Sequence, residues 1–274
     1  MTVKEALSFS CEYLKDISDE AENESKILVS HLADIPFSMV SFSDKTVDEA
    51  ALKAALSKRA EGLPIQYIIG KWWFYKGEFF VGEGVLIPRQ DTETLVETAR
   101  TLIKDKPTPA VCDLCAGSGC IAVSIAGDRP DADVLALEKY DAAYSYLLKN
   151  IAHNKVSVKT VQADVTEGSF GSYDLIVSNP PYITAEDMKT LSAEVKKEPE
   201  TALFGGEDGL YFYRKITELW KGSLKAGGAL AFEVGIGESD AVSEILANNG
   251  FKNIAVVNDL GGVPRVVFGT VDNI

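Results

Sequence analysis

The run of residues 178–182, Ser-Asn-Pro-Pro-Tyr, combines residue types that could bind a planar nitrogen group. It follows a mostly apolar segment, residues 173–177, which is typical of a buried parallel strand. Proline has no N–H group and holds φ near about −65°, so two prolines make a stiff corner with free carbonyl oxygens. Together with the Asn179 carboxamide, the corner presents hydrogen-bond acceptors at the end of a strand, where open α/β sheets bind ligands. The alternative is that the prolines only end the strand and that Tyr182 packs at its rim.

A second candidate site is the stretch from Asp113 to Gly119, Asp-Leu-Cys-Ala-Gly-Ser-Gly. Two glycines after a strand allow a tight turn and a close approach of the backbone to a ligand. The dinucleotide fingerprint Gly-x-Gly-x-x-Gly is incomplete because Ala122 takes the third place, where alanine is tolerated. Taken alone, this loop therefore also fits a nicotinamide enzyme.

Acidic residues end the next two strand-like segments. Glu138 lies 19 residues after Gly119, where a carboxylate could accept both ribose hydroxyls of an adenosine. Asp164 follows the third segment, where it could reach an adenine amino group. A dehydrogenase would also need a proton relay, and neither His31 nor His153 lies at a strand end. The combination therefore favours S-adenosylmethionine over a nicotinamide cofactor.

The segments around these residues alternate between strand and helix, as in a doubly wound sheet. The last two strands are separated by only a few residues, so they must pair antiparallel. This pattern predicts an α/β fold of the class I methyltransferases, with a Rossmann-like, mostly parallel sheet and an antiparallel C-terminal hairpin. Strands are expected at 110–115, 133–138, 157–162, 173–178, 229–235, 253–259 and 264–271, and helices at 118–127, 141–153, 208–224 and 238–249.

The N-terminal part lacks this alternation of strands and helices. Residues 1–63 predict a small helical bundle for partner recognition, with Thr2 as a helix cap, Thr46 and Glu49 as a capping box, and His31 on an apolar face. Residues 64–90 predict a β-hairpin linker, because aromatic runs flank a turn at Gly77. Residues 91–274, beginning with a helix at 91–103, form the methyltransferase domain.

Composition limits the partners. The net charge of −14 argues against direct binding to nucleic acid, which needs clustered basic residues. No apolar run has membrane-spanning length, and no signal-peptide pattern is present, so a cytoplasmic protein is expected. Cys112, Cys115 and Cys120 have metal-like spacing, but a second pair of ligands is absent. With Cys11, they are expected to be free, and no metal is predicted.

Several stretches together resemble the PrmC/HemK family of release-factor glutamine methyltransferases. The resemblance covers the hairpin and the whole catalytic domain, while the N-terminal bundle fits in size and character. Cys115-Ala116, Gln90 and Glu238 depart from the family's usual residues. The matching stretches are Ser178–Ile183, Asp113–Gly119, Pro64–Tyr67, Val85–Arg89, Glu198–Arg214 and Asp259–Val267.

The resemblance implies methylation of the glutamine side-chain amide in the Gly-Gly-Gln loop of class I peptide release factors, which promotes translation termination. The donor would be S-adenosylmethionine, and S-adenosylhomocysteine would be its product. Carried over by position, the cofactor-binding residues are Cys115, Ala116, Gly117, Ser118, Gly119, Glu138, Asp164, Val165 and Asn179. The catalytic residues are Asn179, Pro180, Pro181 and Tyr182.

Two other functions fit parts of the pattern. An adenine-N6 methyltransferase acting on nucleic acid would use the same corner for an exocyclic amino group, with Tyr182 stacking on the base. A catalytically silent adapter would bind adenosine and dock a partner through its N-terminal helices. In either case nothing in the sequence calls for more than a monomer.

Overall fold

The computed structural model describes residues 1–272, which divide into two compact units. Unit 1 contains Met1–Lys71 and the separate segment Ser192–Lys197, whereas unit 2 contains Trp72–Leu191 and the chain from Glu198 onward. Among the described residues, no helix combines the length and the apolar character needed to cross a membrane.

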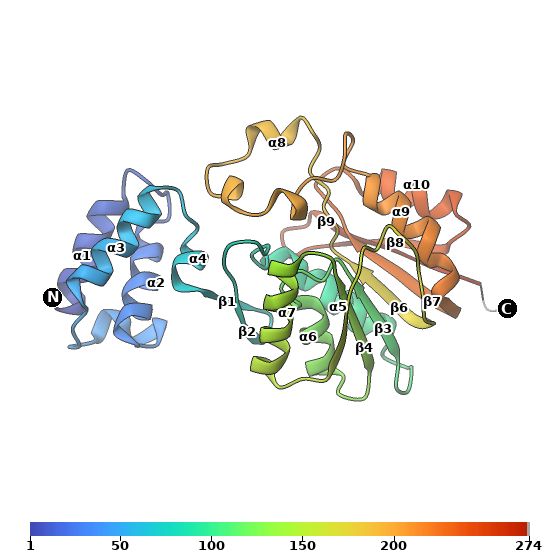
Figure 1. Ribbon diagram of the computed structural model, residues 1–274, viewed down its shortest axis with the longest axis horizontal. Helices are drawn as coiled ribbons and strands as arrows, with labels where there is room; N and C mark the ends of the chain where they lie inside the picture. The colour runs from blue at the N-terminus through green and yellow to red at the C-terminus, as the bar shows by residue number, and fades with distance from the viewer. Residues whose placement is uncertain (273–274) are drawn as a thin grey trace. The chain divides into compact units, whose positions relative to one another are not determined.

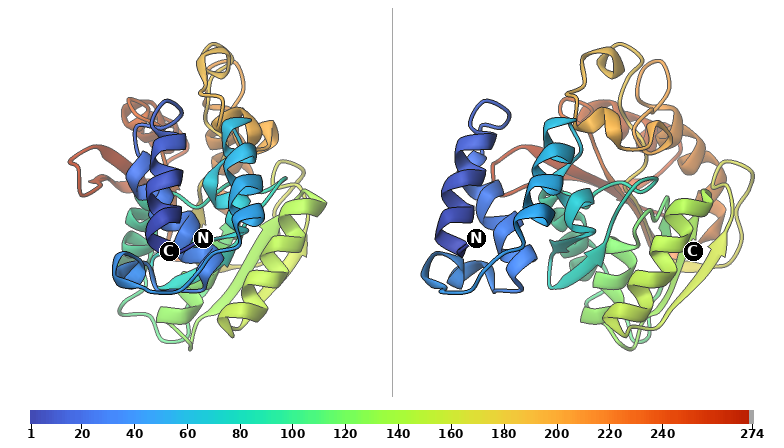
Figure 2. Two further views of the ribbon diagram at one scale, coloured as in Figure 1. Left: turned by 90° about the vertical axis from the view of Figure 1, so that its left-hand side faces the viewer. Right: turned by 60° about the vertical axis from the view of Figure 1, so that its left-hand side comes forward.

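Unit 1 is a helical bundle in which α1 (Val3–Leu14), α2 (Ala21–Ala33) and α3 (Glu49–Ala60) pack side by side (Figure 2). The 3-10 helix η1 (Phe37–Phe42) and the short helices α4 (Ile65–Ile69) and η3 (Val195–Lys197) complete it. The helical prediction for this region is confirmed. The short helix α4 was not expected, because a five-residue helix after Pro64 has too few turns to show a period.

The predicted cap of α1 is confirmed, and that of α3 is wrong. Thr2 and Glu5 form a reciprocal capping box at the start of α1. At α3 the cap is Asp48, whose Oδ1 accepts a hydrogen bond from the Ala50 N–H at 2.8 Å. An aspartate directly before the helix caps it without help from Thr46.

The buried face of α2 also differs from the expectation, because His31 is exposed. Glu24 points inward instead, and its carboxylate accepts two hydrogen bonds from Arg59, at 2.8 and 3.0 Å. The Arg59 side chain is 2% exposed and also pairs with Glu194. A buried guanidinium needs carboxylate partners, so this pair determines which face of α2 turns inward.

Unit 2 begins within the predicted hairpin, which consists of β1 (Lys71–Phe74) and β2 (Gly77–Phe80). The following helix, α5 (Glu93–Leu102), starts two residues later than predicted, because the 3-10 turn η2 (Gln90–Thr92) precedes it. This turn leaves Thr92 buried, at 2% exposure.

The core of unit 2 is a seven-stranded sheet with the strand order β5-β4-β3-β6-β7-β9-β8. The first five strands in this order run parallel, and β9 pairs antiparallel with both β7 and β8. The predicted architecture is therefore confirmed. The strands are β3 (Ala110–Leu114), β4 (Asp133–Glu138), β5 (Val158–Gln162), β6 (Tyr173–Ser178), β7 (Leu224–Glu233), β8 (Lys252–Asn258) and β9 (Pro264–Thr270).

Helices cover both faces of this sheet (Figure 1). With α5 on one face lie α6 (Cys120–Asp128) and α7 (Asp141–Asn154), and on the other lie α9 (Tyr211–Trp220) and α10 (Ser239–Asn248). Alternate residues of β3, such as Val111 and Cys112, enter the two separate cores. Shorter elements of unit 2 are α8 (Asp187–Thr190), η4 (Glu200–Ala202) and η5 (Lys221–Ser223). The carboxyl ends of the parallel strands meet at one edge.

Candidate active site

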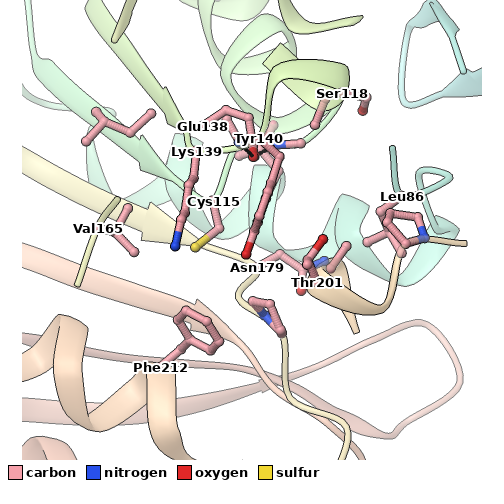
Figure 3. A pocket seen from close by; sticks show the side chains of 18 of the residues that line it. Leu86, Cys115, Ser118, Glu138, Lys139, Tyr140, Val165, Asn179, Thr201 and Phe212 are labelled. Atoms are coloured by element: carbon pink, nitrogen blue, oxygen red, sulfur yellow. Dashed lines mark hydrogen bonds between the residues drawn. The ribbon is translucent and has the colours of Figure 1, made fainter. Parts of the chain in front are cut away.

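A cavity of about 240 Å³ lies at this edge of unit 2 (Figure 3). Residues at and after the ends of β3, β4, β5 and β6 surround it. The segment 84–92, η4 and the starts of α6, α7 and α9 also contribute to its wall. The residues expected in the site that line it are Cys115, Ala116, Gly117, Ser118, Glu138, Asp164, Val165, Asn179 and Pro181. Gly119, Pro180 and Tyr182 are their neighbours in the chain and lie outside the lining.

Residues 115–119, which we call the glycine loop, turn the chain from β3 into α6. Cys115, Gly117 and Gly119 all have positive φ angles, of 61°, 56° and 81°. At Gly119 a Cβ atom would meet Leu147 Cδ1 at 2.4 Å, so a larger residue here would force the buried Leu147 side chain of α7 to move. Asn150 of α7, which is fully buried, donates a hydrogen bond to the Ser118 carbonyl at 2.9 Å and supports the loop from behind.

The carboxylate of Glu138, 6% exposed at the end of β4, is tied to the glycine loop. Its Oε2 accepts a hydrogen bond from the Gly117 N–H at 2.8 Å, and its Oε1 accepts one from the Tyr140 N–H at 2.9 Å. Each carboxylate oxygen has a second lone pair, so the group can still accept two ligand hydroxyls from the cavity. The sequence predicted the position of Glu138 but not this support.

Asp164 carries a positively charged partner that sequence reasoning missed. Its Oδ2 lies 2.7 Å from Lys139 Nζ, and its Oδ1 accepts hydrogen bonds from the N–H and hydroxyl groups of Thr166. Burial would raise the pKa of Asp164, but these bonds outweigh burial and hold the pKa below its usual range. Asp164 is therefore ionised at neutral pH, beside the buried Val165.

Residues 179–182, which we call the proline corner, follow β6. The Asn179 Nδ2 group lies 3.3 Å from Thr92 Oγ1, to which it donates a hydrogen bond. Within residues 1–272, neither Asn179 Oδ1 nor the Pro180 carbonyl oxygen accepts a hydrogen bond. The corner thus carries two hydrogen-bond acceptors without protein donors, as the sequence predicted from the absence of proline N–H groups.

The corner is held from outside by the segment 203–205. The Ile183 N–H donates to the Leu203 carbonyl at 2.8 Å, and the Gly205 N–H donates to the Ile183 carbonyl at 2.9 Å. A Cβ atom on Gly205 would meet the Tyr182 Cα at 2.5 Å. Tyr182 itself packs against the core beside α9, and burial raises its pKa to about 12, so its hydroxyl stays protonated.

Two further buried carboxyl groups lie within the last two residues of β3 and β7, outside the cavity lining. Asp113 on β3 is fully buried, its Oδ1 has no hydrogen-bond partner among the described residues, and burial raises its pKa to about 8. Glu233 at the end of β7 is 1% exposed, its Oε2 likewise has no described partner, and burial raises its pKa to about 7. Sequence reasoning did not assign Glu233 to the site, although it ends a parallel strand just as Glu138 does.

The four cysteines are free, as expected. Cys112 and Cys120 are buried, whereas Cys115 is only partly buried and lines the cavity. Burial raises the pKa of the Cys120 thiol to about 12, which keeps it in the unreactive thiol form.

Two protein-family models match the chain. Residues 5–70 match the PrmC N-terminal domain, and residues 90–206 match the methyltransferase small domain. Among curated relatives, the release factor glutamine methyltransferase of Clostridium acetobutylicum is 38% identical, over 97% of this chain and 98% of its own length. The release factor glutamine methyltransferase of Bacillus anthracis is 33% identical, over 99% of this chain and 100% of its own length. The release factor glutamine methyltransferase of Fusobacterium nucleatum is 39% identical over an aligned region that makes up 81% of this chain and 64% of that protein.

Solved structures share the fold at low sequence identity. The hMettl16 catalytic domain in complex with an RNA hairpin gives a TM-score of 0.56 at 16% identity, covering 70% of this chain and 74% of that one. The 16S rRNA N2 G1207 methyltransferase of Thermus thermophilus gives a TM-score of 0.50 at 17% sequence identity, covering 73% of this chain and 49% of that one. These matches identify the fold of unit 2 as that of the class I methyltransferases.

Proposed function

Because the chain belongs to the family of release factor glutamine methyltransferases, we propose that it methylates the glutamine of the Gly-Gly-Gln loop in class I peptide release factors. The methyl donor is S-adenosylmethionine, and the products are an N5-methylated glutamine and S-adenosylhomocysteine. The observation that carries this proposal is the proline corner, where Asn179 Oδ1 and the Pro180 carbonyl have no donor within the described chain. A primary amide has two N–H groups, which match these two acceptors.

The glycine-loop side of the cavity fits the methyl donor. A Cβ atom on Gly117 would have nothing within 4 Å, so the backbone there is open to a ligand. In this proposal the glycine loop holds the methionine part, Glu138 accepts the ribose hydroxyls, and Asp164 and Val165 flank the adenine. When bound, S-adenosylmethionine supplies a methyl group on a positively charged sulfur.

The proline corner supplies alignment and charge stabilisation. An amide nitrogen is a poor nucleophile, because its lone pair is delocalised into the carbonyl group. Hydrogen bonds from both N–H groups, to Asn179 Oδ1 and the Pro180 carbonyl, hold the amide in one orientation and favour the positive charge that develops on nitrogen. Positioning of this kind can contribute about 7–11 kcal/mol to lowering a barrier.

We also propose that unit 1 recognises the protein partner. Phe9 and Tyr13 lie one turn apart on α1, are 37% and 41% exposed, and have ring centroids 6.3 Å apart. Phe42 in η1 is 81% exposed. Exposed aromatic side chains are frequent in protein interfaces. Peptide release takes place in the cytoplasm, so we expect the enzyme to act there, as a monomer.

Mass spectrometry of a release factor incubated with the enzyme and S-adenosylmethionine tests this function. We expect one added methyl group on the glutamine of the Gly-Gly-Gln loop, and none on a release factor in which that glutamine is replaced by asparagine. DNA and RNA offered in parallel with labelled donor test the adenine alternative, which the net charge of −14 disfavours. Label in nucleic acid and none in the release factor would contradict the proposal.

A further inference from the structure

The Asn179 side chain must choose between two orientations that have nearly the same shape. A carboxamide carries an acceptor oxygen on one side and a donor NH2 group on the other, so steric fit alone does not choose between them. The proposed function, on which this inference rests, requires the oxygen to face the substrate amide. Something in the protein must therefore hold the NH2 group.

The immediate partner of the NH2 group is the Thr92 hydroxyl, at 3.3 Å from Asn179 Nδ2. Thr92 is 2% exposed in the turn before α5 and lines the cavity. A hydroxyl has one hydrogen and two lone pairs, so it can either accept from Asn179 or donate to it. Its choice depends on where its own hydrogen goes.

Glu233 provides the destination for that hydrogen. It follows Phe232, the residue paired with Ser178 across β7 and β6, so it lies beside Asn179 at the same edge of the sheet. Burial raises the pKa of Glu233 to about 7, and hydrogen bonds from Thr92 and Asn179 act in the opposite direction. An ionised carboxylate only accepts hydrogen bonds, so it draws the Thr92 hydrogen and leaves Thr92 as an acceptor for Asn179.

The charged surroundings of Glu233 come from several elements. Arg265 on β9 favours its ionised form, and Asp91 in η2 opposes it. Arg265 is itself shared, because its Nη2 lies 3.1 Å from Asp91 Oδ2 and 3.2 Å from Asp259 Oδ2. The other titratable groups that sense the Glu233 charge are Tyr182, Tyr213 and Cys120, all of which are neutral at pH 7.

We propose that Glu233 and Thr92 are positioning residues that lock the Asn179 carboxamide, with its NH2 group held by the protein and its oxygen presented to the substrate amide. When Glu233 gains a proton it becomes a donor, and the Thr92 hydroxyl is then free to donate as well. The reversed orientation of Asn179, with its oxygen toward Thr92, is then no longer disfavoured by two acceptor oxygens facing each other. The lock therefore holds in the ionised form and opens in the protonated form.

This lock predicts how turnover depends on pH. The active form has an ionised Glu233, so kcat should fall as the pH is lowered through about 7. Binding of the cofactor product should not follow this change, because the glycine loop, Glu138 and Asp164 lie at the ends of β3, β4 and β5, whereas Glu233 ends β7. A role of Glu233 in stability alone would change the melting temperature without producing such a limb in the kcat profile.

The variants Glu233→Gln, Thr92→Val and Thr92→Ser test the lock in the full chain, with Glu244→Gln, an exposed carboxylate on α10, as the control. With release factor as substrate, we expect kcat to fall about 10- to 100-fold for Glu233→Gln and Thr92→Val, the usual worth of a hydrogen bond to a charged group. Thr92→Ser keeps the hydroxyl and should stay within a few-fold of the wild type. The acid limb should disappear in Glu233→Gln, while S-adenosylhomocysteine binding, measured by calorimetry, stays within a few-fold.

Unchanged kcat and an unchanged pH profile in Glu233→Gln would overturn the lock. A wild-type enzyme that does not methylate release factor would instead overturn the proposed function. Hydrogen exchange of the Asn179 side-chain amide, followed by NMR at one pH, then still decides the lock. Exchange should be faster in both Glu233→Gln and Thr92→Val than in the wild type, and equal rates in Thr92→Val and wild type would overturn it even if Glu233→Gln fails to fold.

Discussion

The glycine loop and the proline corner follow the neighbouring strands β3 and β6 and both line one cavity, but their polar atoms are paired differently. The glycine loop has left-handed turns, and its Ala116, Gly117 and Gly119 N–H groups all donate within the protein. Both oxygens of the neighbouring Glu138 already accept backbone hydrogen bonds. The proline corner offers only acceptors, and its nearby carboxyl group, Glu233, has an oxygen without a described partner. The polar groups of the glycine loop and Glu138 are thus paired within the protein. The proline corner and Glu233 instead have acceptor atoms that remain available to a ligand or a proton.

The largest effect is expected from removing the acceptor of the proline corner. Asn179→Ala should abolish turnover, because one of the two hydrogen bonds that orient the substrate amide is lost in the transition state. S-adenosylhomocysteine binding should stay within a few-fold, since the glycine-loop side is untouched. Kinetics with release factor and calorimetry measure the two effects. Normal turnover would show that the Asn179 carboxamide does not orient the substrate amide.

A smaller effect, on cofactor binding instead of turnover, is expected at Glu138 beside the glycine loop. Glu138→Ala should weaken cofactor binding by ~1.5–3 kcal/mol, because a charged acceptor for the ribose is lost and the Gly117 and Tyr140 N–H groups lose theirs. Calorimetry with S-adenosylhomocysteine measures the loss, and Glu244→Ala serves as the control. Unchanged binding would mean that the ribose lies elsewhere.

The smallest effect distinguishes two glycines within the glycine loop. Gly117→Ala and Gly119→Ala both place a Cβ atom on a residue with positive φ, which costs about 1–2 kcal/mol. Only at Gly119 does the new atom also collide with Leu147, at 2.4 Å. Urea unfolding should therefore show the larger loss of stability for Gly119→Ala. The reverse order would mean that contact with α7 does not restrain the loop.

Much of unit 2 could be predicted because its strands are buried on both faces. Such strands are apolar runs that end at a polar residue, so β3, β4 and β6 were located to within one residue. Unit 1 was predicted less well in detail. The orientation of α2 depends on the Glu24–Arg59 pair, whose members lie 35 residues apart, and no local period reveals such a pair. Periodicity therefore put His31 on the wrong face.

The candidate site follows the same division. Glu138, Asp164 and Asn179 could be predicted because each lies at a strand end or within two residues of one, at the edge where open α/β sheets bind ligands. Thr92 and Lys139 could not, because their roles arise from contacts made by folding. Thr92 meets Asn179 across 87 residues of chain, and Lys139 meets Asp164 across 25. Motifs thus pointed to Glu138, Asp164 and Asn179, which line the cavity, but not to Thr92 and Lys139, which line it too.

The segment Ser192–Lys197 has a consequence for any attempt to separate the two units. The chain leaves unit 2 after Leu191 and returns to it at Glu198, so unit 1 is assembled from two pieces of sequence. A truncated protein starting at Trp72 would retain Glu194 but lack Arg59, its ion-pair partner. Unit 1 is therefore not a detachable module, and swapping it between homologues would require exchanging this internal hexapeptide as well.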